Sequence, residues 1–236
     1  MRSLVVASTA FALAALSAQA DEKATGIQIP FPGLTTHVIA GEDAAMPEQI
    51  SYDASLSKLI NKPYEVAEGI EITRLISTRL DRAKEDSYLI EFDPGPSADP
   101  AFIITDEKSK KKVGTIGADA LVVPGNGFIY AIGRTNNMHE ERQKFAVRGG
   151  ELVEIKQPFS YVGLDTKAKV ALTLTAAKDG GEVIAKIPEG DALQVVLRDG
   201  EHLLVKTRFG LVGWWKMKTD VMADNAEIEG IYFAGD

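Results

Sequence analysis

The chain has 236 residues, and its 34 acidic side chains outnumber its 26 basic ones to give a net charge of -8. This acidic balance disfavours nucleic acid and anionic membrane surfaces as partners, because both attract proteins mainly through lysine and arginine. The chain contains no cysteine. That excludes disulfides, thiolate metal sites, a cysteine nucleophile and the lipid-bearing cysteine of a bacterial lipoprotein.

Residues 1–20 have the features of a cleavable secretion signal. Arg2 supplies a positive start, the apolar run Leu4–Leu16 is too short to span a bilayer, and Ala18–Ala20 offers the small side chains that a signal peptidase accepts. The alternative is a buried apolar helix at the N-terminus. We expect a periplasmic or secreted bacterial protein that starts at Asp21 and is not inserted in a membrane after cleavage, since no later apolar run is long enough.

Residues 21–49 are rich in glycine and proline and have little periodicity, which is typical of an extended arm or linker. Two pieces of this arm, Ile27–Ile29 and Thr36–Ile39, could add short edge strands.

Residues 50–168 are expected to form a β-rich domain. The segment contains short β-branched or aromatic runs bounded by turn residues. Glycine-bearing turns at Pro124–Gly127 and Arg148–Glu151 separate pairs of these runs and predict hairpins. Glu71–Ala83 fits both a helical stripe and a strand alternation, and the neighbouring run Tyr88–Phe92 favours the strand. Ala54–Asn61 is the other helix candidate.

Residues 169–220 contain five short strand-like runs separated by glycine-bearing turns, a pattern that suits a small barrel. The order of runs and turns resembles the bacterial SH3-like (SH3b) domain family, and the residues that match the family pattern are Ile184, Ile187, Gly190, Val195–Leu197, Gly210 and Gly213–Trp215. The resemblance implies a five-stranded SH3-like barrel and a groove for a peptide or a cell-wall fragment. Leu203 stands where the family commonly has a tryptophan. The expected fold class is therefore mostly β, with a β-rich N-terminal domain followed by this barrel.

The aromatic side chains of the module are the candidate ligand contacts. Trp214 and Trp215 are adjacent in a strand, so they point to opposite faces and only one of them can lie in the core. We expect the outward tryptophan, Phe209 and the loop Ala176–Glu182 to form the contact face. The alternative is that both tryptophans close the ends of the barrel with partial exposure. Alternation predicts that the buried set is Leu193, Val195, Leu197, Leu204 or Val205, Val212 and one tryptophan.

Residues 221–236 form an acidic tail that also carries Ile228, Ile231, Tyr232 and Phe233. Because of this apolar content, the tail is expected to dock back on a domain rather than hang free.

The sequence carries no recognised catalytic motif. His139–Glu141 invites a metal interpretation, but Gln143 stands where a second zinc-binding histidine should be, and a solvated turn is the simpler explanation. Glu91 and Asp93 share one strand face, as the acid and base of a glycosidase might, although acids beside a proline-glycine turn more often mark a loop entrance. We therefore expect no catalytic residue, cofactor or metal ligand.

Two functions from different classes remain. The favoured hypothesis is a non-enzymatic exported binding or adaptor protein, whose SH3-like module recognises a cell-wall fragment or an envelope protein. The alternative is a cell-wall or glycan hydrolase that uses the same module for targeting. The lack of a catalytic motif in the sequence favours the binding hypothesis, while the resemblance to the SH3-like family is compatible with both functions.

Overall fold

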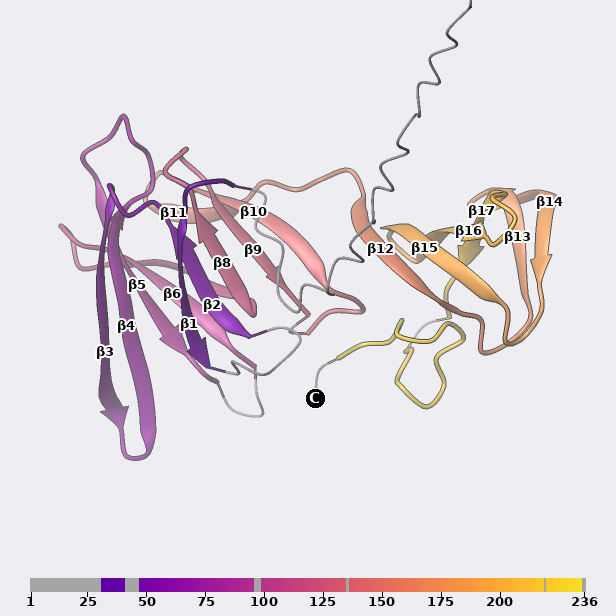
Figure 1. Cartoon of the computed structure of the whole chain (residues 1–236), viewed down its shortest axis with the longest axis horizontal. Helices are drawn as coiled ribbons and strands as arrows, with labels where there is room; N and C mark the ends of the chain where they lie inside the picture. Colours follow the sequence, from indigo (N-terminus) through magenta and orange to yellow (C-terminus); the bar gives the residue numbers. More distant parts are fainter. Residues whose placement is uncertain (1–30, 41–46, 96–98, 135, 219, 235–236) are drawn as a thin grey trace, which may run out of the picture.

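The computed structural model describes residues 31–40, 47–95, 99–134, 136–218 and 220–234, and within them every regular element is a β-strand. No helix in these ranges could cross a membrane. The strands form three sheets, two in an N-terminal domain and one in a C-terminal domain (Figure 1). The prediction of a mostly β protein is confirmed. The predicted signal peptide and the strand candidate Ile27–Ile29 lie outside the described residues.

The first sheet of the N-terminal domain joins distant parts of the chain. Its order is β1-β2-β8-β9-β10-β11. The strands run over β1 (Thr35–Ala40), β2 (Glu48–Tyr52), β8 (Ala120–Val123), β9 (Ile129–Gly133), β10 (Glu141–Arg148) and β11 (Glu151–Glu154). β2 and β8 pair in parallel and the other neighbours are antiparallel. The expected edge strand at Thr36–Ile39 is therefore confirmed within β1.

The second sheet is an antiparallel meander in the order β3-β4-β5-β6-β7. Its strands are β3 (Ser57–Ala67), β4 (Ile70–Arg79), β5 (Ser87–Asp93), β6 (Ala101–Asp106) and β7 (Lys112–Gly117). The strand interpretation of Glu71–Ala83 holds for most of that segment. A helix at Ala54–Asn61 is wrong, because β3 begins at Ser57 and pairs along its length with β4.

The two N-terminal sheets pack face to face around one apolar core. Alternate residues of both sheets are buried there, among them Ile50, Ile76, Ile90, Phe102 and Leu121. This inward alternation is what a two-layer β-sandwich requires.

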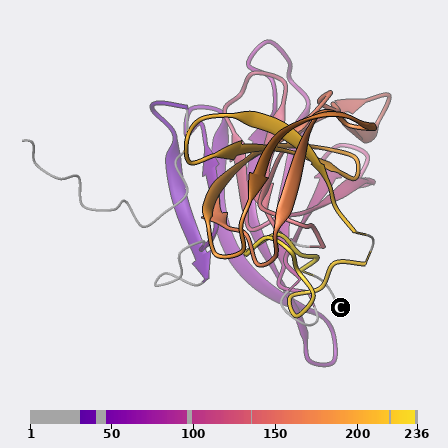
Figure 2. The same cartoon turned by 90° about the vertical axis from the view of Figure 1, so that its right-hand side faces the viewer.

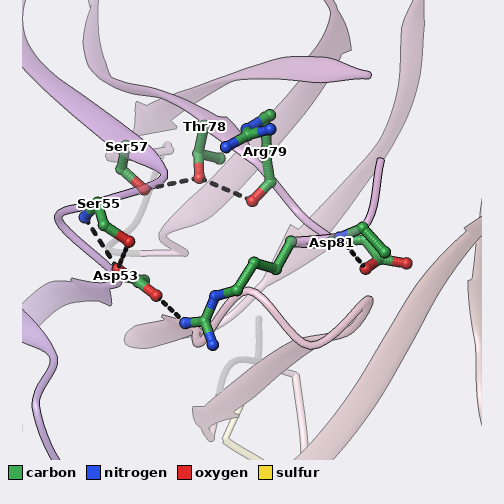
Figure 3. Close-up of polar contacts among 8 residues, drawn as sticks. Asp53, Ser55, Ser57, Thr78, Arg79 and Asp81 are labelled. Carbon is green, nitrogen blue, oxygen red and sulfur yellow. Dashed lines mark hydrogen bonds and ion pairs between the residues drawn. The ribbon is translucent and has the colours of Figure 1, made fainter. Parts of the chain in front are cut away.

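Polar contacts close one end of the sandwich. Asp53, after β2, accepts hydrogen bonds from the hydroxyl and the backbone N–H of Ser55 and forms an ion pair with Arg82 of the β4–β5 connection. Figure 3 shows Asp53 beside Ser55, and Ser57 beside Thr78, whose hydroxyl groups lie 2.7 Å apart. The Asp53–Arg82 ion pair therefore joins the connection after β2 to the β4–β5 connection, and the Ser57–Thr78 contact joins β3 to β4 within the second sheet.

The C-terminal sheet has six strands in the order β12-β15-β16-β17-β13-β14. They are β12 (Ser160–Lys167), β13 (Leu172–Ala177), β14 (Gly180–Ile187), β15 (Ala192–Asp199), β16 (His202–Thr207) and β17 (Val212–Lys216). A closed five-stranded barrel is not found, because β12 adds a sixth strand beside β15 and, among the described residues, β12 does not pair with β14.

The inward side chains of this sheet agree only in part with the expectation. Leu193, Val195 and Val205 are buried, as expected. The sheet has a bulge between Val195 and Leu197, which shifts the register and leaves Leu197 half-buried. Val212 is 44% exposed because it begins β17 directly after the turn, so its predicted burial is wrong.

The C-terminal segment docks on the C-terminal domain, as its apolar content predicts. Ile228 and Ile231 are buried in the core of that domain, and Ile228 forms a β-bridge with Ala168. Figures 1 and 2 show this yellow segment below the strands of the C-terminal sheet.

The same segment continues to the N-terminal domain. The backbone N–H of Tyr232 donates to the Met138 carbonyl at 3.3 Å, and the N–H of Ala234 donates to the Asn137 carbonyl at 3.0 Å. We call residues 226–234 the strap, since they contact both domains.

Candidate functional site

The two tryptophans of β17 divide between the two faces of the C-terminal sheet. Trp215 pairs with the buried Leu203 and packs against the core, whereas Trp214 pairs with Leu204 and points to the opposite face. Both tryptophans are half-buried. Trp214 is therefore the outward one and Trp215 the inward one.

Trp214 belongs to a small aromatic surface with one amine. Lys178 Nζ lies 5.0 Å from the centre of the Trp214 ring system and 5.8 Å from that of Phe159, and it forms an ion pair with Asp199. An ammonium at such distances is attracted to the ring faces. We call Phe159, Lys178 and Trp214 the tryptophan surface. The structure thus brings Lys178 and Trp214 together. The expected long loop Ala176–Glu182 is wrong, because β13 ends at Ala177 and β14 begins at Gly180, which leaves only a tight hairpin turn.

Phe209 lies elsewhere on the same domain. It is 88% exposed in the turn between β16 and β17 and borders a hollow of about 500 Å³ with Lys186, Asp191 and Arg208. None of the residues that line this hollow belongs to the tryptophan surface.

A second aromatic surface lies where the two domains meet. This interdomain cleft has a volume of about 590 Å³, and its floor is formed by β8, β9 and β10. The side chains that define it are Phe31, Tyr130, Arg142, Lys144, Gln157 and Tyr161. The rings of Phe31 and Tyr130 are 4.8 Å apart between centres and tilted by 44°. Tyr161 of β12 supplies the wall from the C-terminal domain.

The interdomain cleft is positively charged. The described residues of its lining include Arg142 and Lys144 and no acidic side chain, whereas three other hollows in the described part of the chain each have an acid in their lining. Lys144 Nζ lies 3.7 Å from the ring centre of Phe128 and 6.0 Å from that of Tyr130. Arg142 Nη2 is 2.9 Å from a carboxylate oxygen of Glu140. Among the described residues Lys144 forms no ion pair, so its charge is free to meet a ligand.

The interdomain cleft and the tryptophan surface are adjacent. Tyr161 belongs to the first and Phe159 to the second, and two residues of extended chain span about 7 Å at most. Tyr161 is 57% exposed, and its ring covers the backbone of Gly163.

Glu91, the sequence candidate for a catalytic acid, is held in structural contacts. Tyr64 Oη donates a hydrogen bond to Glu91 Oε1 at 2.8 Å, and Arg74 Nε lies 3.3 Å from the same oxygen. The pKa of the Tyr64 hydroxyl is raised, first by burial and then by the Glu91 hydrogen bond. Asp93 accepts the backbone N–H of Gly95.

His139 lies near the domain junction and is 3% exposed, so the expectation of a solvated turn is wrong for this side chain. Its Nδ1 lies 2.9 Å from the Glu140 carbonyl oxygen, and its Nε2 lies 3.8 Å from a carboxylate oxygen of Glu141. Burial is the main cause that lowers the pKa of His139. The described residues contain no group of three or more metal-binding side chains.

Comparisons with known proteins add no relative: no protein-family model matches the chain, and no curated protein or solved structure matches it either.

The sequence analysis missed the residues of the interdomain cleft. Phe128 and Tyr130 are alternate residues on either side of the buried Ile129, and Phe159 and Tyr161 follow Pro158 at alternate positions. Alternating exposed aromatics were therefore a signal in the sequence. The approach of these side chains to one another was not a signal in the sequence, because Phe31 lies 99 residues before Tyr130 and Tyr161 lies 31 residues after it.

Proposed function

We propose that this protein is a non-enzymatic binding or adaptor protein of the bacterial cell envelope, exported by its N-terminal signal and located in the periplasm or outside the cell. Its ligand is a cell-wall component or another envelope protein. The C-terminal domain acts as an SH3-like recognition module. The turn glycines Gly190 and Gly210, which match that family's pattern, have positive φ angles and support this part of the proposal.

The observation that carries the proposal is the tryptophan surface. A half-buried indole and an exposed phenyl ring lie beside one amine: Trp214 is in β17, Phe159 directly precedes β12, and Lys178 is in the tight turn between β13 and β14. Aromatic side chains fixed on a rigid scaffold supply contact area with little loss of conformational entropy on binding.

The hydrolase alternative has weaker support. A general acid needs access to its substrate, but the Glu91 carboxylate is buried and already bonded to Tyr64 and Arg74. The Glu91→Gln variant distinguishes the two functions. The binding proposal expects full ligand binding in this variant, while loss of a wall-degrading activity would support the hydrolase.

The direct test is co-sedimentation of the purified mature protein with isolated cell-wall sacculi, together with capture of partners from envelope extract. Trp214→Ala should weaken retention roughly tenfold. Leu59→Ala is the matched control, because Leu59 is an exposed apolar side chain of β3 in the other domain. Equal binding by Trp214→Ala and the wild type would contradict the role of the tryptophan surface.

Export is tested separately by mass spectrometry of periplasmic and culture fractions. The expected N-terminus is Asp21. An intact Met1 terminus in the cytoplasm would contradict the location and the wall-related function.

A further inference from the structure

We propose that the interdomain cleft binds a carboxylate-bearing saccharide chain, with Lys144 facing the carboxylate and the rings of Phe31, Tyr130 and Tyr161 facing the sugars. This inference deepens the proposed function and rests on it, since it names the chemical class of the envelope ligand.

Charge indicates the acidic part of the ligand. The protein carries a net charge of -8, yet the described residues that line the interdomain cleft include two cations and no acid. Arg142 is partly neutralised by Glu140, whereas Lys144 lies against the ring of Phe128 without an acidic partner among the described residues. An anion that enters the cleft gains the attraction of Lys144 and meets no like charge on the lining.

The uncharged lining indicates a sugar. Tyrosine and phenylalanine rings present flat apolar faces that match the C–H faces of a sugar ring. The Tyr161 phenol and the Gln143 amide offer donors and acceptors to sugar hydroxyls. Gln157 Nε2 already donates to the Arg142 carbonyl and Tyr130 Oη already accepts from Asn126, so Gln157 contributes its amide oxygen and Tyr130 its hydroxyl proton.

Topology leaves the floor of the interdomain cleft without a free strand edge, so the only edge strand at the cleft among the described residues is β12 in its wall. Peptides often bind to β domains by adding a strand to an unpaired edge. The floor of the interdomain cleft is β8, β9 and β10, and each of these strands already has a neighbour on both sides. The floor therefore offers side chains rather than backbone groups to a ligand.

The adjacency of the two aromatic surfaces indicates a chain rather than a single sugar. A ligand that fills the interdomain cleft at Tyr161 has Phe159 and Trp214 next along its path. Contacts at two adjacent surfaces raise the affinity for a longer ligand through effective concentration.

The experiment is isothermal titration calorimetry of the mature protein with disaccharide-peptides released from bacterial cell wall. The same fragments with their carboxyl groups amidated are the matched ligand. Lys144→Gln should raise the Kd roughly tenfold, and amidation should have a similar effect on the wild type. Amidation should cause no further loss in Lys144→Gln, because the two changes remove the same interaction.

Further variants separate the charge from the rings. Tyr130→Leu should weaken binding of both fragment types, and Trp214→Ala should weaken only fragments with several disaccharides. Lys58→Gln, on exposed strand β3, is the control and should bind as the wild type does. Unchanged melting temperatures for the variants exclude loss of fold as the cause.

Three results would overturn the inference. If sacculi bind the wild type but Lys144→Gln and Tyr130→Leu bind fragments normally, the cleft is not the site and the proposed function stands. If polyglutamate binds with dependence on Lys144 and wall fragments do not, the ligand is an acidic polypeptide. If neither sacculi nor fragments bind and no envelope protein is captured, the proposed function fails as well.

Discussion

Asp53 shows how one side chain joins the two sheets of the N-terminal domain. It follows β2 of the first sheet, and its partner Arg82 lies after β4 of the second. The hydrogen bond from the Ser55 hydroxyl is the largest cause that lowers the pKa of Asp53, and the Ser55 N–H and Arg82 add to it. A carboxylate whose pKa is lowered by folding makes the free energy of unfolding depend on pH.

Asp53→Asn should lower the urea midpoint at neutral pH. A carboxylate whose pKa is lowered by folding stabilises the protein above its unfolded pKa of about 3.9, and this contribution is lost as the pH falls through the folded pKa. The difference in urea midpoint between the wild type and Asp53→Asn should therefore shrink below about pH 3.9. Urea unfolding followed by circular dichroism at pH 7 and pH 3 measures it, and Asp224→Asn on the exposed tail is the control.

The tryptophan pair separates stability from binding. Trp215→Ala removes an indole that packs on the core of the C-terminal domain and should cost about 3 kcal/mol, the lower end for large aromatic deletions, because Trp215 is half-exposed. Trp214→Ala should cost less, since Trp214 lies on the opposite face. Chemical denaturation of both variants measures the costs. A larger loss for Trp214→Ala would contradict this assignment of the two faces.

At the scale of elements, β12 links the fold to the candidate site. Its pairing with β15 is interrupted between Tyr161 and Leu164, and Gly163 in this irregular stretch has a φ of +64°. A Cβ at Gly163 would clash with the Tyr161 phenol ring and its hydroxyl oxygen. The glycine therefore allows both the backbone turn and the position of the Tyr161 ring on the cleft wall.

Gly163→Ala should destabilise the protein by about 1 kcal/mol through the left-handed backbone and should also weaken ligand binding by displacing Tyr161. Gly200→Ala is the matched control, because Gly200 has a φ of +60° and no atom within 4 Å of an added Cβ. Thermal unfolding and calorimetric titration of both variants separate backbone strain from ring displacement. Normal ligand binding by Gly163→Ala would show that the Tyr161 position does not matter.

At the scale of the whole molecule, the strap and the β9–β10 loop hold the domains together. Arg134 Nη2 donates to the Tyr232 carbonyl at 2.8 Å and to the Met138 carbonyl at 3.3 Å, and its guanidinium lies 4.2 Å from the centre of the Tyr232 ring. Met138 packs against the core of the C-terminal domain. The interdomain cleft is built across this junction, so its shape depends on these contacts.

His139 should make the junction sensitive to acid. Its neighbours from the packed elements are Glu140 and Glu141 of the same stretch, Arg134 before it and Arg198 of β15. Burial, assisted by the two arginines, lowers the pKa of His139 below the ordinary value of 6.5, against the opposing effect of the Glu140 carbonyl and Glu141. The unfolded chain therefore takes up the proton first, and the stability is fully present above about pH 6.5 and decreases as the pH falls below it.

Calorimetric melting at pH 7.5 and pH 5.5 tests this expectation. The melting temperature of the wild type should fall on acidification. The melting temperature of His139→Asn should fall by a smaller amount, whatever its value at pH 7.5. His202→Asn, in the C-terminal sheet, should keep the wild-type dependence. A pH dependence that persists unchanged in His139→Asn would assign the effect to other groups.

The sequence by itself determined the all-β class, because side-chain alternation and turn glycines are local signals that strands require. It also determined that only one tryptophan of β17 could face the core, since neighbours in a strand point to opposite sides. The strand register decided which of the two tryptophans faces the core. The bulge between Val195 and Leu197 could not be predicted from the side-chain alternation. The sixth strand β12 and the absence of a closed barrel were likewise decided by pairing between distant segments. The interdomain cleft depends on the tertiary structure entirely, because Phe31, Tyr130 and Tyr161 meet only after strand pairing and the strap have placed the two domains together.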